Sequence, residues 1–140
     1  MPTSDNFIAR CRKEREKGGA LATWEWRVGD GLYDPHSEQR GSVVSVLPDR
    51  VRVALDDALM IASFAGEDLA SCFPLPSLER MVAELEAAGW FMHTVQRWGL
   101  TWACEGRGNI DRMDAEPFAD FTLRAYCAMR KEKNGGEEEG

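Results

Sequence analysis

Cys104 and His93 are the residues whose types most suggest covalent chemistry. A cysteine becomes a nucleophile when a base lies within reach of its thiol. If Trp98 and Gly99 form a two-residue turn, His93 lies opposite Cys104 across a hairpin. That register puts both residues on the face that helices should cover, whereas a reactive thiol needs exposure and positive neighbours. We therefore expect a buried thiol, and a thiol-dependent enzyme is the least favoured hypothesis.

Other catalytic and metal-binding patterns are weaker still. Asp56-Asp57 and Glu67-Asp68 belong to an acidic segment, where carboxylates are expected to face solvent. The four cysteines are widely spaced, and His36 and His93 add no CxxC or CxxH pair, so the spacing indicates no zinc site. Free thiols in a reducing compartment are expected. The sequence thus predicts no catalytic residue, no metal and no cofactor.

Arg97 and Trp98 form the strongest candidate for binding, because tryptophan and arginine dominate interaction hot spots. The indole of Trp98 could stack on a nucleotide base while Arg97, Arg107 and Arg112 contact phosphates. The alternative is that Trp98 folds back onto the helix layer. Trp26 is a further candidate, since one of Trp24 and Trp26 should point out of its strand.

Charge is unevenly placed along the 140 residues, which carry a net charge of −7. Residues 1–20 hold five Lys or Arg against three Asp or Glu, and residues 21–76 are strongly acidic. Proteins that grip nucleic acid usually present a basic stripe, so binding by the folded body is disfavoured. No apolar run approaches the roughly 20 residues of a membrane span, and the N-terminus does not resemble a secretory signal. We expect no membrane partner.

The first half of the chain should contain a short helix followed by strands. Residues 5–17 predict a helix capped by Asp5. Residues 42–47 and 51–55 are β-branched runs around Pro48-Asp49-Arg50, which predicts a hairpin. In its second strand one face should carry Val51, Val53 and Leu55. Residues 58–64 suit a further strand, and residues 66–76 an irregular link.

The second half switches to a helical period. Leu78, Met81, Val82 and Leu85 form one apolar stripe after Ser77, with Gly89 placed to end the helix. Two strands, a loop over residues 106–113, a helix from Asp114 and a disordered tail over residues 134–140 should follow. The expected hairpin buries one face, made of Phe91, His93, Val95, Leu100, Trp102 and Cys104. The last helix should bury Phe118, Phe121, Ala125 and Met129.

Two stretches resemble known families. The first stretch, over about residues 24–62, resembles SH3-like barrels of transcription-linked and phage-encoded proteins. The residues that carry the resemblance are WRVGDGLYDP…RGSVVSVLPDRVRVALDD. The second stretch, over about residues 76–131, resembles the phage ABA sandwich domain. The residues that carry the resemblance are LPSLERMVAELEAAGW…WGLTWACEG…DAEPFADFTLRAYCAM. Domains of this family consist of a helix, a "GW" strand, a tryptophan-bearing strand and a second helix. The second stretch departs from that pattern at Phe121-Thr122 and in the long loop over residues 106–113.

These resemblances imply an α+β protein with an N-terminal helix and linker (1–20), a small SH3-like β-barrel (21–76) and an αββα layer of two helices on a β-hairpin (77–133). They imply phage origin and transfer no catalytic residue. The leading hypothesis is a non-enzymatic, phage-encoded binding protein of the host cytoplasm. It would inhibit a defence system by occupying a host protein surface or by sequestering a nucleotide signal. The alternative is a nucleic-acid-associated module that uses the barrel and the basic residues 10–17. A homodimer through the outward positions Trp90 and Met92 is also considered.

Overall fold

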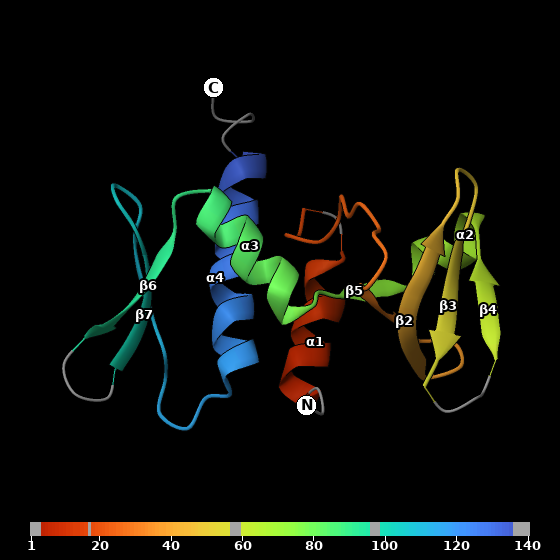
Figure 1. Ribbon diagram of the computed structural model, residues 1–140, viewed down its shortest axis with the longest axis horizontal. Coiled ribbons are helices and arrows are strands. Elements are labelled where there is room, and N and C mark those ends of the chain that lie inside the picture. Colours follow the sequence, from red (N-terminus) through yellow and green to blue (C-terminus); the bar gives the residue numbers. More distant parts are fainter. Residues whose placement is uncertain (1–3, 17, 57–59, 96–98, 136–140) are drawn as a thin grey trace. The chain divides into compact units, whose positions relative to one another are not determined.

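The computed structural model describes residues 4–16, 18–56, 60–95 and 99–135, and Figure 1 shows its ribbon with most of the elements labelled. Helices and antiparallel strands are both present, so the α+β class is confirmed. The chain divides into two compact units. One spans Ile8–Ser77, and the other joins the residues from Leu78 onward to the N-terminal residues through Phe7.

Helix α1 (Asp5–Glu14) matches the helix expected near the N-terminus, but its cap is different. The backbone N–H of Phe7 donates to Ser4 Oγ at 3.0 Å, so Ser4 is the N-cap residue. Asp5 instead lies in the first turn, where a carboxylate favours the positive end of the helix dipole. The Ser4 hydroxyl also donates to the carboxylate of Asp120, 2.9 Å away.

The sheet of the Ile8–Ser77 unit is open. Its order is β4-β3-β2-β1-β5, every pair is antiparallel, and β4 and β5 are its two edges. The expected barrel is therefore wrong as regards closure. The expected irregular link over residues 66–76 is also wrong, because it contains a short helix and an edge strand. The elements are β1 (Gly31–Asp34), β2 (Gln39–Val46), β3 (Val51–Leu55), β4 (Ile61–Phe64), α2 (Gly66–Ser71) and β5 (Phe73–Leu75).

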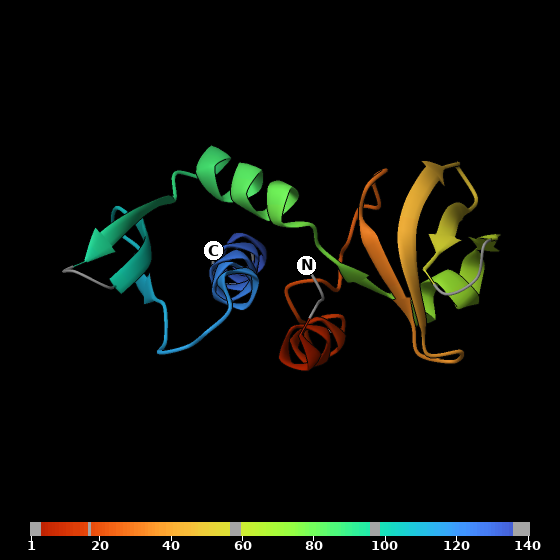
Figure 2. The same cartoon turned by 60° about the horizontal axis from the view of Figure 1, so that its bottom comes forward.

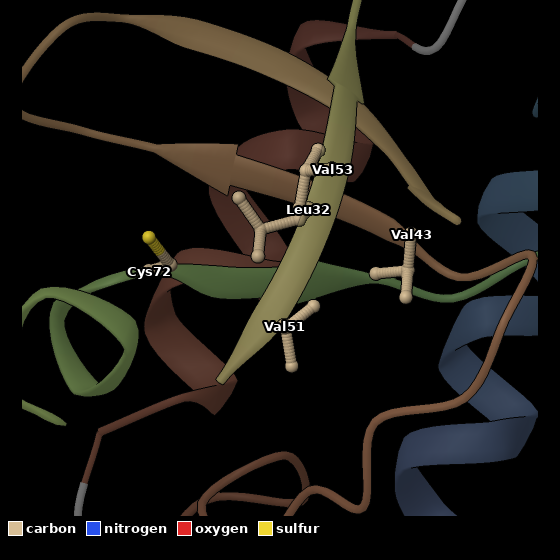
Figure 3. Close-up of a cluster of buried hydrophobic side chains, with 5 residues drawn as sticks. All are labelled: Leu32, Val43, Val51, Val53 and Cys72. Carbon is tan, nitrogen blue, oxygen red and sulfur yellow. The ribbon is translucent and has the colours of Figure 1, made fainter. Parts of the chain in front are cut away.

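The core of this unit confirms the predicted alternation in β3. Val51 and Val53 are buried while Arg52 is exposed. They join a cluster of apolar side chains from β1, β2, β3 and the residue before β5, drawn in Figure 3: Leu32, Val43, Val51, Val53 and Cys72. Gly41 lies in β2 opposite Leu55, and a Cβ there would collide with the carbonyl oxygen of Ala54. The close strand pairing therefore needs glycine at position 41.

The other unit contains a three-stranded sheet, not a hairpin. Its strand order is β6-β7-β8, so the loop expected over residues 106–113 is wrong. Gly106 and Gly108 have positive φ angles of 80° and 103°, and Arg107 N–H donates to the Cys104 carbonyl, which closes a tight turn. That turn lets the chain fold back and pair again. The elements are α3 (Leu78–Ala87), β6 (Phe91–Val95), β7 (Gly99–Cys104), β8 (Gly108–Asp111) and α4 (Phe118–Gly135).

Helix α4 begins four residues later than expected. The N–H of Phe121 donates to the Pro117 carbonyl at 3.0 Å, so Pro117 lies at the helix boundary and Asp114 lies outside the helix. The expected apolar residues Phe121, Ala125 and Met129 are buried. The helix continues through Gly135, so residues 134 and 135 do not belong to a tail, and residues 136–140 lie outside the described residues.

The register of β6 and β7 differs from the expected one by three residues. Met92 is paired with Trp102 and His93 with Thr101, because the strands are joined by residues 96–98 and not by a two-residue turn. An odd shift exchanges the faces of one strand relative to the other. Trp102 does face the helices, as expected, but Phe91 and His93 point to the opposite side. Trp90, expected to point outward, is buried.

Candidate functional site

The predicted proximity of Cys104 and His93 is wrong. Cys104 lies on the helix-covered side with Trp102, two residues away, whereas His93 is on the other side and exposed. All four thiols are buried, and burial raises the pKa of the Cys72 thiol to about 12, helped by the charges of Asp34 and Asp68. Across the described residues, His, Cys, Asp and Glu form no group able to hold a metal ion. The disfavoured nucleophile–base pair therefore does not form, and the expected burial of Cys104 is confirmed.

The arginines predicted to bind phosphate lie at opposite ends of β8. Arg107 precedes the strand and its Nε lies 3.3 Å from Glu132 Oε1. Arg112 follows the strand and its Nε donates to the Glu116 carbonyl at 2.7 Å. Five residues of extended chain separate their backbones by roughly 16 Å, too far to hold one phosphate by local geometry. The glycines of the Gly-Arg-Gly-Asn stretch, Gly106 and Gly108, are needed for the positive φ angles of the tight turn, so their presence does not indicate a phosphate site.

The tryptophans of the predicted binding set are separate. Trp98 and Arg97 lie outside the described residues, so their role stays a prediction. Trp26 belongs to the Ile8–Ser77 unit and is half-buried against its core cluster. The guanidinium of Arg15 lies 5.9 Å from the Trp26 ring centroid, and the Trp24 ring packs edge-on at 6.4 Å. These contacts explain Trp26 as part of the fold.

A partly buried ion pair fixes the connection between β8 and α4. Arg124 donates from Nε and Nη2 to both carboxylate oxygens of Glu116 at 2.7 Å. Its Nη2 also donates to the Asp111 carbonyl, while Glu116 accepts the N–H of Met113. Two parallel hydrogen bonds between a guanidinium and a carboxylate fix the relative orientation of the two side chains in addition to pairing their charges. We therefore interpret the Arg124–Glu116 pair as structural. Sequence inspection missed it, because the partners are eight residues apart and separated by an irregular segment.

A second polar cluster joins α3 and α4. Arg80 Nε donates to Glu84 Oε2 at 2.6 Å, and the Tyr126 hydroxyl donates to Glu84 Oε1 at 3.0 Å. Burial alone would raise the pKa of Glu84, but these bonds and the charge of Arg130 lower it below its usual value. Burial raises the pKa of Tyr126 to about 12. Arg80 and Arg130 both lie beside the carboxylate of Glu84, so the charges of the cluster are paired within the fold. We therefore interpret the cluster as structural.

One face of the β6–β8 sheet has no helix over it. Figure 2 shows α3 and α4 on the same side of the sheet, and the buried Trp102 Nε1 donates to Thr122 Oγ1 of α4 across that side. By strand alternation the other side, which we call the open face, carries Phe91, His93, Thr101, Ala103, Asn109 and Asp111. The residues of its two outer strands are exposed, whereas Thr101 and Ala103 of the central strand are buried.

The chemistry of the open face is that of a contact surface. Phe91 is 51% exposed, and its ring packs edge-on against His93 at 5.4 Å between centroids. The Thr101 hydroxyl donates to Asp111 Oδ1 at 2.7 Å, so the charge of Asp111 is engaged within the sheet. An exposed aromatic ring on a sheet face whose one charged side chain is a carboxylate suits another protein better than it suits an anion.

Strand β6 is exposed on both of its faces. Phe91, Met92 and His93 are consecutive and all exposed, although alternate strand residues normally differ in burial. We call these three residues the β6 surface. The sequence missed it because the two-residue turn placed Phe91 and His93 in the core. Trp90, which precedes the strand and is buried, belongs to the opposite alternation, but the sequence does not reveal its burial.

Within the described residues, no helix has the length and apolar character needed to cross a membrane. No protein-family model matches the sequence, and no curated protein or solved structure is significantly similar to the chain.

Proposed function

We propose that this chain is a phage-encoded, non-enzymatic binding protein that acts in the host cytoplasm by occupying a host protein surface. The single observation that supports it is the exposed Phe91 ring on the open face. Exposed aromatic side chains are frequent anchors of protein interfaces. The phage origin and the SH3-like character of the first unit rest on the sequence resemblance.

Occupation of a protein surface is favoured over capture of a nucleotide. Arg107 and Arg112 are engaged with Glu132 and with the Glu116 carbonyl, and they stand at opposite ends of one strand. A nucleotide site needs several donors that converge on one phosphate group. The open face instead offers the exposed ring of Phe91 and a single carboxylate, that of Asp111, and another protein can cover such a surface. Inhibition of a host defence protein would then follow from steric exclusion of its normal partner.

Site-specific photocrosslinking tests this proposal in host bacteria that produce the chain. The variant Asn109→p-benzoylphenylalanine places the reactive group on the open face, in β8 and away from the β6 edge. Glu86→p-benzoylphenylalanine is the matched control, since Glu86 is exposed on α3. We expect one discrete adduct with a host protein at position 109 and none at position 86. Equal, diffuse labelling at the two positions would refute the proposal.

A second candidate, the nucleic-acid-associated module, is favoured by one feature of α1. Arg10, Arg12 and Lys13 are all exposed on this helix. Three phosphate contacts would make the logarithm of affinity fall with the logarithm of salt concentration with a slope of about −3. The triple variant Arg10→Glu, Arg12→Glu, Lys13→Glu should abolish such binding. Affinity for duplex DNA that is independent of salt, or unaffected by these changes, would exclude this function.

A further inference from the structure

The middle of the open face is lined by short side chains of the central strand. Thr101 and Ala103 are buried, although this side of the sheet faces away from α3 and α4 (Figure 2). Their cross-strand neighbours on β6 and β8 are longer and exposed: Phe91, His93, Asn109 and Asp111. The backbones of β6 and β8 lie about 10 Å apart, because each is one strand spacing from β7. One long side chain of a partner can therefore contact residues of both outer strands.

Strand β6 contributes an aromatic pair to this face. The Phe91 ring is half exposed, and the His93 ring packs edge-on against it. This contact restricts both rings, so a ligand that binds them has less side-chain freedom to remove. The face of an aromatic ring carries negative electrostatic potential and attracts a cation. The aromatic pair is thus suited to a positively charged group.

Strand β8 contributes a carboxylate with a fixed orientation. Asp111 is exposed, and its Oδ1 accepts a hydrogen bond from the Thr101 hydroxyl, which orients the carboxylate without neutralising its charge. None of the six strand residues of the open face is a lysine or an arginine. Arg112 and Arg124 lie close by, but both bond to Glu116 at the connection to α4. The open face therefore combines an aromatic pair with a carboxylate.

We propose that the open face holds one arginine side chain of the bound protein, with its guanidinium against the Phe91–His93 pair and hydrogen-bonded to Asp111. This assignment rests on the proposed function and adds the chemical class of the group that the face recognises. Charge complementarity selects a cation. A planar guanidinium can stack on an aromatic ring while it donates to a carboxylate, which the compact ammonium group of lysine does less well. A purely apolar partner would cover Asp111 without offering it an opposite charge.

Titration of the full chain, followed by nuclear magnetic resonance, tests the proposal. The probe is N-acetyl-arginine amide, and its neutral isostere N-acetyl-citrulline amide is the comparison at equal ionic strength. The measurement is made at about pH 8, where an ordinary histidine is uncharged. Amide shifts of open-face residues report binding. Because exposed cation–π contacts and exposed ion pairs are each weak, we expect the arginine probe to bind with a Kd about fivefold lower than that of the citrulline probe.

Three variants assign this preference to the open face. Asp111→Asn removes the charge but keeps an oxygen that can accept from Thr101, and it should abolish the preference for arginine. Phe91→Leu should reduce the preference to about twofold. Asp114→Asn is the matched control, since it makes the same change of charge at an exposed residue that lies outside β8, and it should behave like the wild type. Circular dichroism establishes that each variant is folded.

Equal affinity of the wild type for the two probes would overturn the proposal. It would also be overturned by a preference for arginine that survives Asp111→Asn or is unchanged in Phe91→Leu. Crosslinking at position 109 remains a separate measurement, because it needs a host protein and the titration does not. A discrete adduct without an arginine preference would support the proposed function and exclude the arginine site, whereas an arginine preference without an adduct would do the reverse.

Discussion

The indole nitrogen of Trp102 lies 3.3 Å from the hydroxyl oxygen of Thr122, and both residues are buried. This hydrogen bond connects the central strand β7 to helix α4. It satisfies a donor that would otherwise be unpaired in the apolar layer, where an unsatisfied group costs about 1–3 kcal/mol. The pair therefore fixes which side of the sheet faces the helices, and by exclusion which side is left open.

Removal of the Thr122 hydroxyl, which accepts the hydrogen bond from Trp102, should destabilise the protein more than removal of the Thr122 methyl group. Thr122→Val leaves the Trp102 N–H buried without a partner, and we expect it to lower the free energy of unfolding by about 1–3 kcal/mol. Thr122→Ser keeps the hydroxyl and should cost less. Urea denaturation followed by tryptophan fluorescence measures both. Equal stability of Thr122→Val and the wild type would mean that the hydrogen bond contributes nothing.

Local patterns explain which parts of the fold could be predicted. The alternation of Val51, Val53 and their polar neighbours is a property of a single strand, and the stripe on α3 is a property of a single helix. Strand β8 was missed because its residues, Gly-Asn-Ile-Asp, have little intrinsic strand preference. They pair because the turn at Gly106 and Gly108 delivers them beside β7. Pairing of this kind depends on tertiary context.

The candidate site depended on one register, which is why it was predicted wrongly. A turn at Trp98-Gly99 and a connection through residues 96–98 differ little in sequence terms, yet they place Phe91 and His93 on opposite sides of the sheet. The buried Trp90 indicates the second alternative, but a lone tryptophan does not reveal its own burial. Exposure of the β6 surface could therefore not be deduced before the pairing was known.

The ion pair between Arg124 and Glu116 should be essential to the C-terminal unit. Arg124→Met removes the partner of a buried carboxylate, and we expect it to lower the free energy of unfolding by about 3 kcal/mol. Arg124→Lys keeps the charge but loses the two-pronged geometry, so it should recover only part of that stability. Thermal unfolding compares the two. Full recovery by lysine would show that charge alone matters.

Gly41 should tolerate no side chain. Gly41→Ala forces a methyl group against the Ala54 carbonyl on the neighbouring strand, and overpacking of this kind costs about 1–3 kcal/mol. Ser42→Ala, at the next, exposed position of β2, is the control and should be nearly neutral. Chemical denaturation of both variants gives the comparison. A stable Gly41→Ala protein would require that β2 and β3 are farther apart than described.

The four thiols should be inert in the native protein. Each is buried, and the raised pKa of Cys72 keeps that group as the unreactive thiol. A chromogenic disulfide reagent should therefore label no cysteine rapidly under native conditions and all four after denaturation. Rapid labelling of Cys104 without denaturant would contradict the structure and would revive the thiol-dependent enzyme as a hypothesis.

The phenol of Tyr126 should ionise unusually late. Burial favours its neutral form and raises its pKa to about 12, and the hydrogen bond to Glu84 acts in the same direction. In the unfolded chain the pKa of tyrosine is about 10. The neutral phenol therefore contributes stability that is fully present below about pH 10 and is lost as the pH rises towards about 12. Ultraviolet titration of tyrosinate should show a late phase that disappears in Tyr126→Phe. Tyr33→Phe should retain that phase. Loss of the late phase in Tyr33→Phe would show that Tyr33, and not Tyr126, is the residue that ionises late.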